Sequence, residues 1–192
     1  MPDIDPAHSV LLIMDYQPGI IRNLPNADQQ VARAARVLAL ARSRGVHVGY
    51  VRVAFEDADY ANIPATNKSF SRLAGGGGFN ADAPETAIDE RVAPEPGDIV
   101  VRKTRVGAFS TTDLAQQLRA RDIDTLILAG ISTSGVVLST VRDAADHDYR
   151  IVVLSDGCAD TDPEVHDLLT RKVFPRQAEV VTIADFETLL PT

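Results

Sequence analysis

Two side chains that can exchange protons stand directly after apolar runs in this sequence. Asp15 follows the run Ser9 to Met14, and Lys103 follows the run Asp98 to Arg102. When a carboxylate lies beside an ammonium group, the ammonium group lowers the pKa of the carboxylate, while burial raises that pKa. These opposed effects can bring the pKa of a catalytic acid or base close to neutral pH. Taken alone, Asp15 could instead cap a helix, and Lys103 could be a solvated cation at a strand end.

A turn of small polar residues follows a third apolar run, Thr125 to Ala129. The turn covers residues 130–136 and leads into a stretch with helical spacing. Backbone N–H groups at the start of a helix have no partner within the helix, so they can bind an oxyanion. Alternatively, Ser132, Thr133 or Ser134 is an ordinary helix cap.

The elements that must position these residues alternate between apolar runs and amphipathic stretches. This order is typical of βαβ units and hence of a mainly parallel sheet with helices on both faces. We expect strands at 9–14, 46–54, 98–102, 125–129, 150–154 and 178–182, and helices at 28–44, 112–121, 134–148, from 162 onwards and at 184–190. Right-handed crossovers then predict a three-layer α/β/α Rossmann-like fold with a six-stranded parallel sheet. Ligands of such sheets bind beyond the carboxyl ends of the strands, where Asp15 and Lys103 stand.

One segment, residues 56–97, breaks this alternation. It contains four consecutive glycines, Gly75 to Gly78, and four prolines. Long loops inside a compact domain are usually lids, binding loops or interfaces. We therefore expect a single domain over residues 1–192 in which 56–97 is a lid or interface excursion, the alternative being a flexible segment without a role.

Composition and charge exclude several classes of protein. The net charge of −8 is spread along the 192 residues, which argues against a nucleic-acid surface. No apolar run approaches the ~20 residues that span a bilayer, and no secretory signal begins the sequence. The single cysteine, Cys158, cannot form an internal disulfide, which favours a reducing, cytoplasmic location. Four histidines and one cysteine are too scattered for a zinc cluster.

Three stretches together resemble the isochorismatase-like hydrolases. They are LLIMDYQPGI, VVRKTRVGAFSTTDLAQQLRARDIDTLILAG and AGISTSGVVLSTVRDAADHDYRIVVLSDGCAD, in the family's order, and the match runs from about Ser9 to about Thr182. The resemblance implies a six-stranded parallel sheet and an Asp, Lys and Cys triad at the strand ends. Asp15 and Lys103 match the first two positions. The position of the nucleophilic Cys falls on Val136.

The residue at position 136 decides which chemistry the resemblance implies. Val136 has no lone pair, so it cannot form the thioester that family amidases use. True isochorismatases also lack the Cys, and they hydrolyse a vinyl ether after the Asp protonates the vinyl carbon. The resemblance thus implies a cofactor-free hydrolase of a small molecule, in which Asp15 is the general acid or base and Lys103 tunes it. Ser132 and Ser134 replace that subset's aromatic residue and His, which argues against isochorismate itself.

Two alternatives stay open. The chain could be a pseudoenzyme that binds a small ligand, or an amidase that uses a hydroxyl group or Cys158. Retention of both Asp15 and Lys103 favours a hydrolase, because burying a charge pair costs desolvation energy. The sequence does not identify the substrate.

The resemblance also implies finer features of the site. These are a cis peptide bond between Ile131 and Ser132, and a turn through Gly135 in which the N–H groups of Ser132 and Val136 face the ligand. The metal site of nicotinamidase-type members has no counterpart, because VRVAFEDADY contains no His, so we expect no metal. Family members are commonly dimers or tetramers, which implies a homodimer or homotetramer.

Further residues near the strand ends are expected to contact the substrate. Arg52 can pair with a carboxylate through two hydrogen bonds, although it could be a surface residue. Phe109 is expected in the pocket wall, although core packing is the commoner fate of Phe. His147 and His166 are expected on the surface. The full set of expected substrate-binding residues is Gln17, Arg52, Phe55, Phe109 and Thr133.

Overall fold

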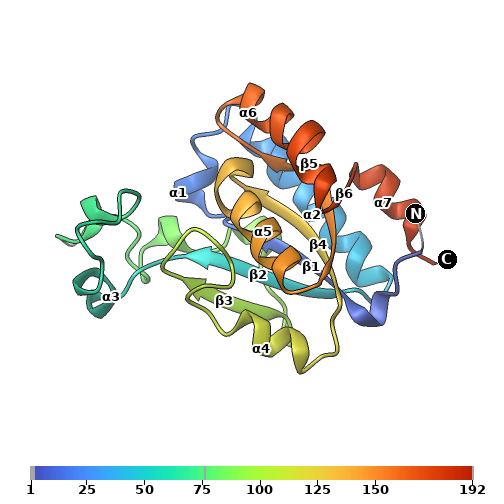
Figure 1. The fold of residues 1–192 in the computed structure, drawn as a ribbon, viewed down its shortest axis with the longest axis horizontal. Helices are drawn as coiled ribbons and strands as arrows, with labels where there is room; N and C mark the ends of the chain where they lie inside the picture. Colours follow the sequence, from blue (N-terminus) through green and yellow to red (C-terminus); the bar gives the residue numbers. More distant parts are fainter. Residues whose placement is uncertain (1–2, 76, 192) are drawn as a thin grey trace.

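The computed structural model describes residues 3–75 and 77–191 and contains one central parallel sheet (Figure 1). Its strands are β1 (Ser9–Met14), β2 (His47–Val53), β3 (Ile99–Lys103), β4 (Thr125–Ile131), β5 (Arg150–Ala159) and β6 (Glu179–Val181). The six strands lie in the order β3-β2-β1-β4-β5-β6, and every pair is parallel. The predicted α/β/α fold with a six-stranded parallel sheet is therefore confirmed.

Helices connect the strands and cover both faces of the sheet. They are α1 (Pro18–Ile21), α2 (Ala27–Ser43), α3 (Asp57–Ala61), α4 (Leu114–Arg119), α5 (Leu138–Asp146), α6 (Pro163–Leu168) and α7 (Ile183–Leu189). Shorter helical segments are Pro6–His8, Ser71–Leu73, Pro84–Thr86, Glu90–Val92, Thr133–Val137, Leu169–Val173 and Phe174–Arg176. Figure 1 shows α4 and α5 on one side of the sheet and α2 and α7 on the other.

The side-chain alternation of β1 divides the core between these two faces. All six residues of β1 are buried, which is typical of a central parallel strand. Leu11 and Ile13 pack in the cluster that includes α2 and α7. Leu12 and Met14 point to the opposite face and pack with residues of α4 and α5. Asp15 is thus held at the end of a strand that is fixed by packing on both sides.

Strand β5 extends beyond its predicted end at residue 154. Its pairing with β4 shifts register between Leu128 and Gly130 and then resumes, with Gly130 opposite Cys158. Such an irregularity inserts extra residues into one strand without ending it. The polar residues Ser155 and Asp156 therefore look like a turn in the sequence but lie within the strand. Cys158 accordingly lies inside β5 rather than after it.

The excursion at residues 56–97 contains α3 and small helical turns that the sequence did not predict. It extends beyond the carboxyl end of β2 (Figure 1). Tyr60 and Ile63 of the excursion pack in a small core with Phe55, which directly precedes it, and the rings of Phe55 and Tyr60 stack with centroids 5.4 Å apart. Apolar packing therefore gives this segment a defined position next to the strand ends.

Candidate active site

Asp15 and Lys103 form a buried ion pair at the carboxyl edge of the sheet. The Lys103 Nζ lies 2.9 Å from the Asp15 Oδ2, and the two side chains are only 2% and 7% exposed. Strands β1 and β3 are not neighbours, because β2 lies between them. The long Lys103 side chain therefore reaches past β2 to make the contact. Asp15 itself has a positive φ of 58°, a conformation that Asp tolerates better than most residues.

The carboxyl group of Asp15 is only partly satisfied. Its Oδ1 atom is buried and has no hydrogen-bond partner among the described residues. Burial raises the pKa of Asp15 to about 6, although Lys103 acts in the opposite direction. A buried oxygen without a partner in the protein is costly, so Oδ1 is an acceptor that a donor in the adjoining cavity can satisfy. Asp15 can therefore both donate and accept a proton near neutral pH.

A cavity of about 280 Å³ opens onto this ion pair. The side chain of Val136 stands in its wall and is 2% exposed. Phe70 and Phe79 reach the cavity from the excursion, so the excursion contributes directly to the wall. The described residues that line the cavity are Asp15, Ile20, Asn23, Val53, Phe70, Phe79, Lys103, Val106, Ile131, Ser132, Gly135, Val136 and Thr161.

The turn after β4, which includes Val136, forms one wall of this cavity. The peptide bond between Ile131 and Ser132 is cis, as the family resemblance implies. The N–H of Gly135 donates to the carbonyl of Ser132 at 3.2 Å, and that of Ser134 donates to Asp160 at 2.8 Å. Four of the residues expected in this turn, 131, 132, 135 and 136, line the cavity.

Two expected substrate-binding residues hold the excursion instead of lining the cavity. Gln17 is fully buried, and its Nε2 donates to the carbonyls of Val53 at 2.9 Å and Thr86 at 2.6 Å. The Arg52 guanidinium donates to the same Thr86 carbonyl at 3.1 Å and to that of Ala81 at 3.2 Å. The expectation that these residues line the substrate pocket therefore needs correction. Strand alternation does not specify that a polar side chain will bind backbone carbonyls.

The other three expected contacts also lie outside the cavity lining. Phe55 is fully buried in the small core of the excursion. Phe109 is partly buried against the core on the α5 side, and its ring lies 5.5 Å from that of the exposed His147. Thr133 is buried, and its Oγ1 lies 2.8 Å from the Nδ1 of His166.

His166 makes a contact that could not be predicted from the sequence. It is half-buried on α6 and contacts Thr133 in the turn after β4, so it is not the free surface residue that we expected. Burial lowers the pKa of His166, which favours the neutral form of the ring. Residues 133 and 166 are far apart in sequence, and only the register of β4 beside β5 brings their helices together. No local pattern carries that information.

Cys158 does not share the cavity of Asp15. It is 3% exposed, its Sγ donates to the Leu128 carbonyl at 3.7 Å, and it borders a different cavity. Burial raises the pKa of its thiol to about 12.

We expect iodoacetamide to modify Cys158 very slowly in the folded protein and rapidly in guanidinium chloride, because the thiolate is the reactive form. Mass spectrometry of the two time courses tests this, and rapid modification of the folded protein would contradict it.

The raised pKa of Asp15 predicts a pH-dependent stability with a definite sign. Between about pH 4 and pH 6 the folded protein holds a proton at Asp15 that the unfolded chain has released, so stability falls as pH rises. A shift from 3.8 to about 6 corresponds to about 3 kcal/mol. Urea unfolding of the wild type and of Asp15→Asn across this range isolates the effect from other carboxylates. A constant difference between the two proteins would contradict the prediction.

The structure adds two negative findings for the residues that it describes. None of the helices in ranges 3–75 and 77–191 is long and apolar enough to cross a membrane. Within the same ranges, no three or more His, Cys, Asp or Glu side chains gather in a way that could hold a metal ion.

The buried acid and amine lie at the carboxyl edge of a parallel α/β sheet, which is where such sheets bind their ligands. The Isochorismatase domain model matches residues 9–185. The chain is 33% identical over 184 residues to the uncharacterized isochorismatase family protein YwoC of Bacillus subtilis, covering 96% of this chain and 95% of that one. It is 30% identical to maleamate amidohydrolase of Pseudomonas putida, covering 91% and 83%. An isochorismatase family structure from Burkholderia thailandensis superposes with a TM-score of 0.85 at 30% identity over the full length of both chains. The chain belongs to the isochorismatase family of hydrolases.

Proposed function

We propose that this protein hydrolyses a small organic molecule without a cysteine nucleophile, at a vinyl ether or a related C–O or C–N bond. Asp15 is the general acid and base, and Lys103 positions and tunes it. The observation that carries this proposal is the ion pair at 2.9 Å, which borders a cavity whose wall holds Val136. The proposal requires an acid whose pKa lies far enough above the ordinary Asp value for part of the protein to be protonated near neutral pH, and a pKa of about 6 provides this.

The proposed reaction needs only this carboxyl group and water. For a vinyl ether, Asp15 gives its proton to the terminal vinyl carbon, and the ether-bearing carbon becomes an oxocarbenium ion. Water adds to that carbon and returns a proton to Asp15. The adduct then collapses, so the C–O bond breaks and a carbonyl compound and an alcohol leave. Lys103 stabilises the Asp15 carboxylate while its proton is on the substrate.

The positions of Val136 and Cys158 support water as the nucleophile. Val136 borders the cavity but offers no attacking atom. Cys158 borders the other cavity and donates to the Leu128 carbonyl, so its sulfur is not directed at Asp15. The amidase alternative through Cys158 therefore has no geometric support. Maleamate amidohydrolase, a relative, acts on an amide, which keeps C–N bonds within the proposed substrate class.

A substrate screen combined with removal of the thiol tests the proposal. The purified protein is incubated with a panel of small enol ethers, amides and esters, and products are followed by mass spectrometry. We expect turnover of at least one panel member, with the rate unchanged in Cys158→Ala. Loss of turnover in Cys158→Ala would favour a thiol mechanism. Binding of panel members without any turnover would favour a ligand-binding protein.

A further inference from the structure

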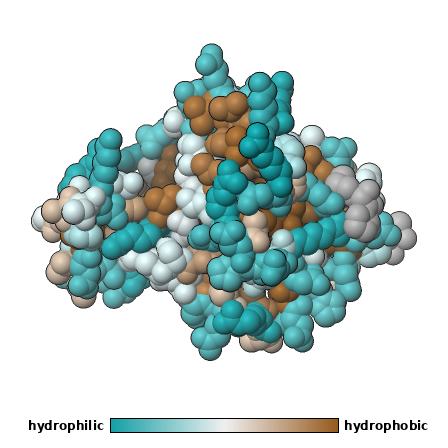
Figure 2. Space-filling view, viewed as in Figure 1, coloured by the Kyte–Doolittle hydropathy of each residue, from teal (hydrophilic) through white to brown (hydrophobic). Residues whose placement is uncertain are grey.

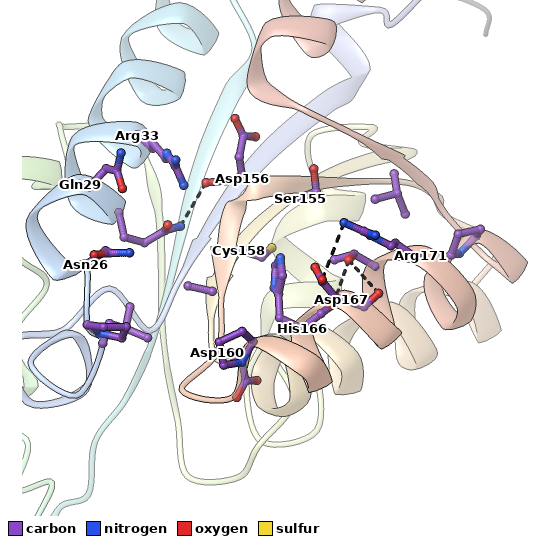
Figure 3. A pocket seen from close by; sticks show the side chains of 18 residues that line it. Asn26, Gln29, Arg33, Ser155, Asp156, Cys158, Asp160, His166, Asp167 and Arg171 are labelled. Atoms are coloured by element: carbon purple, nitrogen blue, oxygen red, sulfur yellow. Dashed lines mark hydrogen bonds and ion pairs between the residues drawn. The ribbon is translucent and has the colours of Figure 1, made fainter.

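A second cavity is lined by His166 and Asp160, which bind residues of the turn after β4. Its volume is about 620 Å³, within the roughly 300–1,000 Å³ of small-molecule sites. It lies between the first half of α2 and the helix α6, over the end of β5 (Figure 3). Its apolar surface includes Cys158, Ala159 and Val180. The space is therefore large enough for a compact organic molecule with a hydrocarbon part.

Most acidic groups around this cavity are already bound within the protein. The two oxygens of Asp160 accept the N–H groups of Ser134 at 2.8 Å and Asp162 at 3.3 Å. Asp167 pairs with Arg171 at 3.7 Å. These groups do not need a ligand to satisfy them.

Two charged side chains in the wall of this cavity have hydrogen-bonding groups without a partner among the described residues. Arg33 is half-buried, and no described residue forms an ion pair or hydrogen bond with its guanidinium. Asp156 accepts the N–H of Ile183 at 2.8 Å with one oxygen, and its second oxygen has no partner in the described part of the chain. In Figure 3, Arg33 extends from α2 near Asp156 of β5, whose carboxyl group points away from Cys158 and His166. The wall therefore offers one cation and one acceptor oxygen beside an apolar floor.

We propose that this cavity binds a small carboxylate that also carries an N–H or O–H donor and an apolar body, as an apolar amino acid does. A guanidinium recognises a carboxylate through two parallel hydrogen bonds. The free oxygen of Asp156 accepts the donor, which also offsets the repulsion between Asp156 and an anionic ligand. The floor of Cys158, Ala159 and Val180 receives the hydrocarbon part.

Hydrogen bonds link the larger cavity to the turn after β4. His166 and Asp160 both border the larger cavity. His166 bonds Thr133, and Asp160 binds the N–H of Ser134, both at 2.8 Å. The next residues of the turn, 135 and 136, line the cavity of Asp15. We therefore expect a ligand that moves His166 or Asp160 to change the position of the turn.

The binding test uses L-leucine as the probe and follows backbone amides by NMR. We expect saturable binding with a Kd on the order of 1 mM. The analogues 4-methylpentanoate and 3-methylbutylamine, each lacking one polar group, should bind more weakly. Arg33→Gln should raise the Kd about tenfold or more. The matched control Arg36→Gln removes an exposed Arg of the same helix that pairs with Glu187, and it should leave the Kd unchanged. Absence of saturable binding, or equal binding by Arg33→Gln, would overturn the proposal.

The same titration tests the link to the turn without any measurement of turnover. On saturation, the amide signals of Ser134 and Gly135 should shift in the wild type. Thr133→Val removes the bond to His166 from a residue that does not border the larger cavity, so it should reduce those shifts while leucine still binds. Binding without any shift of these amides would overturn the link to the turn. Because no readout depends on hydrolysis, failure here is distinguishable from failure of the proposed function.

Discussion

Replacing Asp15 with Asn is expected to lower kcat by roughly 10³-fold, within the range for loss of a general acid. The amide has nearly the same shape but cannot donate or accept the proton in the proposed reaction. Substrate affinity should change little, because the cavity wall is otherwise intact. The wild-type rate should also fall as pH rises above about 6, where Asp15 loses its proton. The measurement is steady-state kinetics on the substrate found in the screen.

A matched control exists on the same chain. Asp122 also has a positive φ, 52°, but it is exposed and does not border the cavity. Asp122→Asn makes the same chemical change in a similar backbone conformation, so it should retain the wild-type kcat. If Asp15→Asn and Asp122→Asn have equal activity, Asp15 is not the acid and the proposed mechanism fails.

Replacing Lys103 with Met is expected to reduce the free energy of unfolding by about 3–5 kcal/mol at pH 8. The change leaves the carboxylate of Asp15 buried without its cation, and its Oδ1 already lacks a partner among the described residues. Removal of the ammonium raises the pKa of Asp15 further. The loss of stability should therefore be smaller at pH 5, where the carboxyl group is protonated. Urea unfolding at pH 8 and pH 5 measures the loss of unfolding free energy at each pH.

Two further variants separate the ion pair from a general effect of removing Lys. Lys68→Met removes an exposed Lys of the excursion and should change stability by less than about 0.5 kcal/mol. The double variant Asp15→Asn with Lys103→Met removes both charges, so it should be more stable than Lys103→Met alone. A double variant as unstable as the sum of the single changes would show that the two groups do not interact.

The positions of the main chemical groups could be predicted because they follow from strand order and local motifs. Asp15 and Lys103 each end an apolar run, and a parallel sheet brings strand ends to one edge. The sequence could not show that β2 separates their strands, which makes the pair depend on the length of the Lys side chain. It also could not show that β5 continues past its polar residues, because bulges leave no periodic signal.

The wall residues of the two cavities were harder to predict. Phe70 and Phe79 reach the cavity from a Gly-rich segment without periodicity, so nothing in the sequence distinguishes them from other loop aromatics. Gln17 and Arg52 were expected to bind substrate because they are polar and near strand ends. Both bind backbone carbonyls, since buried carbonyl groups of an irregular segment need donors from elsewhere.

That shared attachment divides the excursion into two parts with different tolerance to change. Gln17 and Arg52 both donate to Thr86, which fastens the segment's returning half to the sheet. Phe70 and Phe79, which border the cavity, precede this fastening point in the chain. Phe79 is held independently, because its carbonyl accepts the N–H of Phe55 at 2.7 Å. Substitutions at Phe70 should therefore reshape the cavity wall without loosening the attachment at Thr86.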